Sequence, residues 1–139
     1  MKNSRTARVA AAASLALVAA LTLSSCSSIV DAAQGVTEKE FDDFASAEDG
    51  WPGEIPAWLP ADVSEIHVRS TNNGKVAMVR ADTTSKPAGD CAETERKQIA
   101  VWVTDWSPEK VTPETVIACG DWEIMPVDGG WFGWYSADE

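Results

Sequence analysis

Few residues of this chain have side chains suited to catalysis or metal binding. His67 is the sole histidine, so a Ser-His-Asp arrangement would have to use it, and no serine lies in a Gly-x-Ser-x-Gly turn. One histidine and three cysteines argue against a His/Cys metal site, and the chain has neither a calcium-binding loop nor a glycine-rich phosphate loop. We therefore predict no catalytic residue, no metal and no cofactor.

The 22 Asp and Glu residues leave one catalytic alternative open. Hydrolysis of a glycoside needs two carboxylates that face each other across the substrate. A chain with this many acids always contains some pair, so the pattern has no specificity. The prediction is a non-catalytic protein, and the alternative is a hydrolase that uses a carboxylate pair.

Aromatic residues suggest binding instead. The chain has seven tryptophans, which is many for a core of this size, and indoles with a polar edge suit flat sugar or peptide surfaces. Four aromatic rings fall within residues 131–135, where alternation sends them to both faces of a strand. We predict an exposed ligand surface formed by Trp131, Trp134 and Tyr135; in the alternative, these rings fill the core.

Basic residues gather around one predicted hairpin in an otherwise acidic chain. This set comprises His67, Arg69, Lys75 and Arg80. It could hold an anionic partner, or it could pair with the acids of the chain itself.

The first 26 residues have the pattern of an export signal. Lys2, Arg5 and Arg8 precede an apolar run over residues 9–23, which is shorter than the ~20 residues that a membrane-spanning helix needs. The run ends in Leu23-Ser24-Ser25-Cys26, which resembles the lipobox of bacterial lipoproteins. The resemblance implies that residues 1–25 are a cleaved signal peptide and that Cys26 carries a diacylglyceryl anchor.

The remaining two cysteines form an even pair in an oxidising compartment. An exported chain with three thiols would leave one of them without a disulfide partner. Lipidation of Cys26 removes this problem, because it leaves the pair Cys91 and Cys119. They lie too far apart in sequence for a redox-active Cys-x-x-Cys motif. We predict a structural disulfide between them.

Charge restricts the partners of the exported part. All 22 acids but only eight of the eleven basic residues follow residue 25, so residues 26–139 carry a formal charge of −14. This charge argues against nucleic acid and against anionic head groups as ligands. We predict an extracytoplasmic protein of the cell membrane, attached through its lipid, that binds a cell-wall polymer or an envelope protein or has a structural role. The hydrolase alternative would act on the envelope as well.

Composition divides the exported part in two. Residues 26–50 are rich in Ser, Ala, Asp and Glu and are predicted to be a lipidated acidic tether. Within the tether, Thr37 and Glu40 form a capping-box pattern ahead of Phe41 and Phe44, so a short helix docked through these rings is possible. Residues 51–139 are predicted to form the globular domain, which opens with a proline-rich lead-in over residues 51–60.

A β-hairpin is the clearest local prediction. Asn73-Gly74 separates residues 65–71 from residues 75–81, and this dipeptide favours a two-residue hairpin turn. The turn places Val68 opposite Val79, Ile66 opposite Ala81 and Ser70 opposite Ala77, all on one face. His67 then opposes Arg80, and Arg69 opposes Met78, on the other face.

The rest of the domain also favours strands. Residues 99–106 alternate with bulk on both sides and predict a central strand, and residues 115–119, 122–127 and 131–135 predict three shorter strands. Residues 93–97 predict one helical turn. The expected fold is mainly β (or β-rich α+β), with a single small antiparallel sheet of about six strands, little helix and one disulfide.

Overall fold

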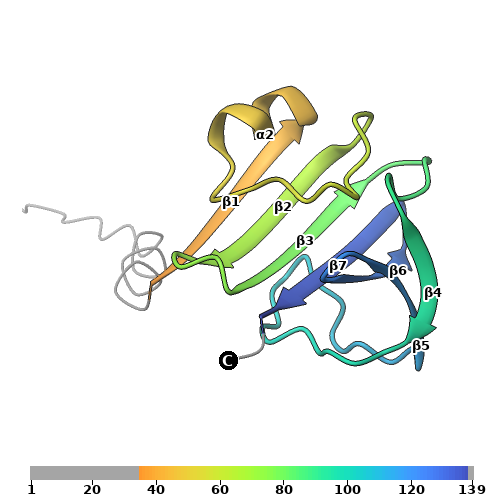
Figure 1. Cartoon of the computed structure of the whole chain (residues 1–139). Helices are drawn as coiled ribbons and strands as arrows, with labels where there is room; N and C mark the ends of the chain where they lie inside the picture. Colours follow the sequence, from red (N-terminus) through yellow and green to blue (C-terminus); the bar gives the residue numbers. More distant parts are fainter. Residues whose placement is uncertain (1–34, 138–139) are drawn as a thin grey trace, which may run out of the picture.

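The computed structural model describes residues 35–137, and these residues form one sheet and one short helix (Figure 1). The signal peptide, Cys26 and residues 26–34 of the predicted tether lie outside the described residues. The elements are β1 (Val36–Asp43), α2 (Phe44–Gly50), β2 (Ser64–Thr71), β3 (Val76–Asp82), β4 (Cys91–Glu95), β5 (Thr115–Cys119), β6 (Trp122–Val127) and β7 (Gly130–Ser136).

The seven strands form one antiparallel sheet in the order β1-β2-β3-β7-β6-β5-β4. Short turns join β2 to β3, β5 to β6 and β6 to β7, whereas α2 and residues 51–63 connect β1 to β2, and residues 96–114 connect β4 to β5. Because β7 returns to pair with β3, it lies in the centre of the sheet. The mainly β fold with a single antiparallel sheet and a Cys91–Cys119 bridge is confirmed. The strands number seven rather than about six.

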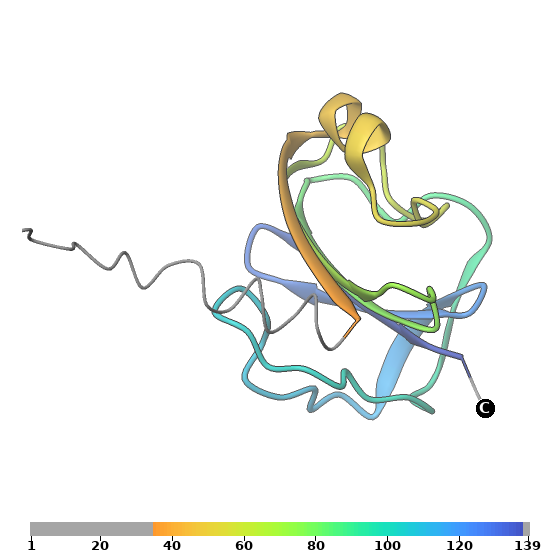
Figure 2. The same cartoon turned by 90° about the vertical axis from the view of Figure 1, so that its left-hand side faces the viewer.

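The sheet is strongly curved, and each face carries its own hydrophobic core (Figure 2). On face one, α2 and residues 51–63 lie across β2 and β3, and they bury Trp58, Leu59 and Val63 against Ile66, Val68 and Val79. On face two, residues 96–113 run along the opposite side and cover Met78, Phe132 and Trp134. Since both faces are covered, nearly continuous apolar runs are tolerated in the central strands.

The predicted central strand at residues 99–106 is wrong. These residues pair with no strand; they form part of the irregular covering segment of face two. The expectation that both sides of this stretch are covered is also wrong: Trp102 and Trp106 pack on the core, whereas Ile99 and Val103 point outward, with exposed fractions of 64% and 71%. An extended segment that covers a sheet needs the same alternation as a strand, so the pattern cannot distinguish the two.

The boundary of the predicted tether is also wrong. Residues 36–43 form the edge strand β1, paired along its length with β2, and residues 44–50 form α2, so the folded domain begins at Val36 rather than at Trp51. The helix is capped by Asp43, which accepts a hydrogen bond from the Ser46 N–H at 2.8 Å. This bond is the main reason that the pKa of Asp43 lies below its ordinary value.

The predicted helix through Phe41 and Phe44 is wrong, because Phe41 lies in β1 and α2 begins at Phe44; only the packing of the two rings is as predicted. The Thr37–Glu40 capping box does not form, because both residues lie within β1. Phe41 and Phe44, at the junction of strand and helix, pack against the core of face one. The rings of Phe41 and Trp51 stack at 5.9 Å and connect this junction to the lead-in.

The hairpin is confirmed, with one irregularity. Val68 pairs with Val79, Ser70 with Ala77, His67 with Arg80 and Arg69 with Met78, as the turn dictates. The predicted pairing of Ile66 with Ala81 is lost because a β-bulge shifts the register between Ser64 and His67. Glu65, at the bulge, has a positive φ of 47°. Ile66 is still fully buried on the expected face.

The predicted helical turn at residues 93–97 is wrong, because residues 91–95 form β4. This strand pairs with β5 alone and lies at the edge of the sheet. Edge strands tolerate the Glu and Thr side chains that make this stretch resemble a helix in sequence.

Candidate functional site

The predicted surface of Trp131, Trp134 and Tyr135 does not exist as one patch. Trp134 is 1% exposed and lies in the core of face two, whereas Trp131 and Tyr135 lie on face one. The prediction failed because β7, although last in sequence, is the middle strand of the sheet. Of the three rings, Tyr135 alone lines the groove described below.

Trp131 has a structural role at the margin of face one. Its Nε1–H donates to the Ser85 carbonyl oxygen at 2.9 Å. The Ser85 hydroxyl donates in turn to Asp62 at 2.7 Å, and Thr83 donates to the same carboxylate at 2.9 Å. These bonds, from Ser85 first and Thr83 second, hold the pKa of Asp62 below its ordinary value. They tie residues 83–85 to the segment that covers the sheet.

A groove of about 410 Å³ opens on face one. One wall is the lead-in, residues 51–58, and the other is formed by the turns at residues 88–90 and 119–122. Its floor includes Ser70, Ala77 and Tyr135 from the sheet. The groove therefore joins three parts of the chain that are far apart in sequence, and its volume is within the range of small-ligand sites.

Aromatic rings dominate the lining. Trp58 and Trp122 meet edge to face at 5.9 Å, and Trp122 stacks on Tyr135 at 5.7 Å. Trp51 lines the same groove at its outer end. Trp58 is 2% exposed, whereas Trp51, Trp122 and Tyr135 are half-buried, so these three offer ring surface to a ligand.

Gly133 allows Trp58 to lie this deep. A Cβ atom on Gly133 would approach Trp58 Cζ2 to 2.6 Å, which is closer than real Cβ contacts. The small residue in the aromatic stretch of β7 is therefore required by packing, because the indole of Trp58 lies directly over its backbone.

Three carboxylates border the groove. Glu54, Asp90 and Asp121 line it from three different loops, and all three are exposed. No lysine, arginine or histidine is among the residues that line it. The site thus combines an aromatic interior with a border that carries only negative charge.

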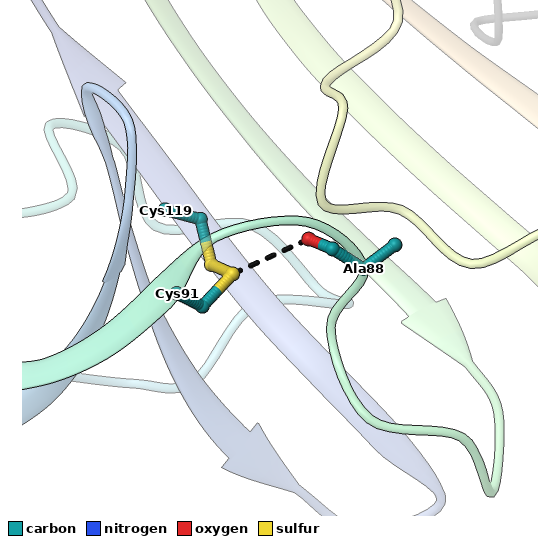
Figure 3. Close-up of a disulfide and its surroundings, with 3 residues drawn as sticks. All are labelled: Ala88, Cys91 and Cys119. Carbon is teal, nitrogen blue, oxygen red and sulfur yellow. Dashed lines mark hydrogen bonds between the residues drawn. A yellow bond between two sulfur atoms is a disulfide. The ribbon is translucent and has the colours of Figure 1, made fainter.

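Cys119 lines the groove, and Figure 3 shows its disulfide with Cys91 beside Ala88, another lining residue. Cys91 of β4 and Cys119 of β5 are cross-strand partners with a Cα–Cα distance of 4.4 Å. The Cys91 sulfur also lies 3.3 Å from the Ala88 carbonyl oxygen; this is a contact and no hydrogen bond, because a bridged sulfur carries no hydrogen. The bridge thereby holds residues 88–90 beside residues 119–122.

Three members of the basic set lie on the opposite face of the sheet and are engaged there. Arg69 pairs with Glu38 at 2.6 Å and lies over the Trp102 ring at 5.3 Å. His67 stacks on Trp106, whose Nε1–H donates to Glu38 at 2.8 Å.

Arg80 completes this network on face two. Its guanidinium donates to the carbonyl oxygens of Trp106 and Asp128 at 3.2 and 3.1 Å. Three of the four basic residues thus hold the covering segment of face two in place. Internal pairing, rather than an anion site, accounts for them.

The residues that form the groove were only partly visible in the sequence. Trp58 and Trp122 belonged to the seven tryptophans, but nothing in the sequence singled them out, and the loops at residues 89 and 120 gave no signal. Within residues 35–137, no group of three or more His, Cys, Asp or Glu side chains is placed to hold a metal ion. The same residues include no helix long and apolar enough to cross a membrane.

The chain was compared with known protein families, with curated proteins and with solved structures, and it matches none of them.

Proposed function

We propose that this chain is a lipid-anchored, extracytoplasmic binding module of the cell envelope, and that its groove on face one takes a segment of an envelope polymer or of a partner protein. The observation that carries the proposal is the aromatic lining, Trp51, Trp122 and Tyr135, which is half-buried and faces a preformed groove. Ligand sites are typically concave and lined by such rings. No cofactor is part of the proposal.

A variant that fills the groove tests this proposal. Ala88 is an exposed lining residue, so Ala88→Trp should occupy the groove without removing a core contact. The assay uses protein carrying Cys26→Ser, because a lipid anchor would itself sediment with membranes. In that background, we expect the affinity of Ala88→Trp for isolated cell envelopes to fall about tenfold, a loss of about 1.4 kcal/mol of binding free energy.

The matched control is Ala92→Trp. Ala92 is exposed on β4 and does not line the groove, so this variant should sediment like the parent. Equal sedimentation of Ala88→Trp and the parent would contradict the proposal. Release of soluble fragments from the same envelopes would favour the hydrolase alternative, for which the three carboxylates at the groove are the supporting observation.

The anchor is tested separately. Cys26→Ser removes the thiol that would be lipidated, so we expect the variant to leave the membrane fraction and to take up no labelled fatty acid. Two acyl chains on one residue hold a protein stably, whereas a net charge of −14 on residues 26–139 gives it no affinity for an anionic membrane surface. A Cys26→Ser protein that still fractionates with membranes and still takes the label would refute lipidation.

The folded domain would lie close to the membrane. Eight residues separate Cys26 from Gly35, and the nine Cα–Cα steps between them span at most about 32 Å. Gly35 accepts a hydrogen bond from the Asn72 N–H, beside the turn that carries the groove residue Gly74. The anchor therefore places the groove within reach of ligands near the membrane surface.

A further inference from the structure

We infer that the groove binds a basic peptide segment, with a lysine or arginine side chain held between the aromatic rings and the carboxylates at the border. The inference rests on the proposed function, because it names the ligand of that same groove. The juxtaposition of half-buried rings with exposed carboxylates, and the absence of any basic residue among the lining residues, carry it.

The carboxylates at the groove have no cation of their own. Within residues 35–137, no ion pair or side-chain hydrogen bond engages the carboxylates of Glu54, Asp90 or Asp121. By contrast, Glu38 and Glu40 on face two contact Arg69 and His67. The domain thus pairs acids with bases on one face and leaves three acids at the groove open to an external cation.

None of the basic residues within residues 35–137 lines the groove. Lys75 follows the lining residue Gly74 in sequence, but it is exposed and does not line the groove. Lys39 donates to the Gly50 carbonyl oxygen at 2.8 Å. A cation at this site must therefore come from the ligand.

The aromatic rings of the groove can contact both the charged group and the methylene chain of a lysine or arginine. A lysine or arginine side chain can lay its methylene groups against Trp122 and Tyr135 while its charge meets a ring face or a carboxylate. An aromatic ring attracts a cation by about 0.5–2 kcal/mol, depending on desolvation, and the carboxylates add to this attraction. A neutral glycan would use the rings but gain nothing from three charges at the border.

Peptide titrations of the mature chain carrying Cys26→Ser, which stays in solution, test the inference. The probe is a capped Gly-Lys-Gly-Lys-Gly peptide, and its partner is the same peptide with both lysines Nε-acetylated. Tryptophan fluorescence follows binding, since Trp122 lies in the groove. We expect the acetylated peptide to bind at least tenfold more weakly than the lysine peptide. Raised salt should weaken the binding of the lysine peptide.

Two double variants with the same change in net charge show whether the lysine peptide binds at the groove. The double variant Asp90→Asn, Asp121→Asn should bind the lysine peptide about tenfold more weakly than the parent. Asp105→Asn with Glu109→Gln makes the same change in net charge on exposed residues of the opposite face and should leave binding unchanged. Equal weakening by both double variants would show general attraction to an acidic protein and would overturn the inference.

The remaining outcomes distinguish a failure of the inferred ligand from a failure of the groove as a binding site. If both peptides bind equally well, the ligand is not recognised by its charge and the inference fails, while the groove stands as a binding site. If neither peptide binds but Ala88→Trp still abolishes sedimentation with envelopes, the inference fails and the proposed function stands. If Ala88→Trp also has no effect, both fail.

Discussion

Reduction of the Cys91–Cys119 bridge is expected to lower the midpoint of thermal unfolding by about 12–32 °C. The bridge closes a loop over a sequence separation of 28 residues, and the chain-entropy estimate for such a loop is about 3–4 kcal/mol. In a domain of roughly 100 residues, each kcal/mol shifts the midpoint by about 4–8 °C. Scanning calorimetry with and without a thiol reductant measures the shift.

The loss of stability on reduction should be largest in the edge strand β4. β4 has five residues, pairs with β5 alone and has no fully buried side chain, so the bridge and the backbone pairing with β5 are what attach it to the sheet. In the reduced protein, amide protons of β4 should exchange first, and the groove should lose the wall at residues 88–90.

The control for this experiment uses Cys26→Ser. That variant keeps the bridge and should show the same loss on reduction, whereas the Cys91→Ala, Cys119→Ala double variant should be insensitive to the reductant. A shift below about 3 °C in the Cys26→Ser protein would mean that the bridge contributes less than 1 kcal/mol, contrary to its assigned role.

Local sequence signals predicted the parts of the fold that local interactions determine. The hairpin of β2 and β3 was predictable in register because the Asn73-Gly74 turn and the alternation of Ile66, Val68 and Ser70 agree. The bulge at Glu65 was not, because the local sequence does not determine where the register of two strands shifts. The disulfide followed from the cysteine count, and the cross-strand pairing of Cys91 with Cys119 agrees with it.

Edge strands were missed for a common physical reason. β1 and β4 each have a sheet neighbour on one side, so their solvent-facing positions carry charges such as Glu38, Glu40 and Glu93. Those charges made β1 resemble a disordered tether and β4 resemble a helical turn. Hydrogen bonds to a neighbouring strand, which leave no mark on hydropathy, make them strands.

The site depends on strand order, which the sequence does not encode locally. Trp131, Trp134 and Tyr135 looked like an exposed set because a terminal strand often lies at an edge. β7 instead lies between β3 and β6, so its alternation buries Trp134 under residues 96–113 and directs Tyr135 to the groove on the other face. The pairing of β7 with β3 and β6 decided which rings could meet a ligand.

Glu123→Ala is expected to lower the free energy of unfolding by about 2–4 kcal/mol, because it removes the acceptor of two charge-assisted hydrogen bonds. Glu123 is 4% exposed on β6. Its two carboxylate oxygens accept from the backbone N–H groups of Lys97 and Gln98 at 2.7 and 2.9 Å. Urea unfolding followed by circular dichroism measures the loss.

The same substitution should loosen the cover of face two. Gln98 links this part of the segment to the sheet through its own side chain, donating to the Asp121 carbonyl oxygen and accepting from the Ser136 N–H. Without Glu123, the amide protons of Lys97 and Gln98 should lose their protection from exchange, and Trp134 beneath the segment should become accessible to acrylamide. The groove lies on face one, so binding of the lysine peptide by the folded variant should be retained.

A matched substitution distinguishes this anchoring role from a general effect of charge. Glu93→Ala removes the same charge from an exposed position on β4, where no side-chain hydrogen bond among residues 35–137 depends on it, and should change the unfolding free energy by less than about 0.5 kcal/mol. If the two variants unfold at the same urea concentration, the carboxylate of Glu123 does not hold the covering segment. If Glu123→Ala alone is destabilised and exposes Trp134, this one buried carboxylate holds the irregular covering segment in place. Residues 99–106 of that segment alternate in sequence as a strand does, although they form none.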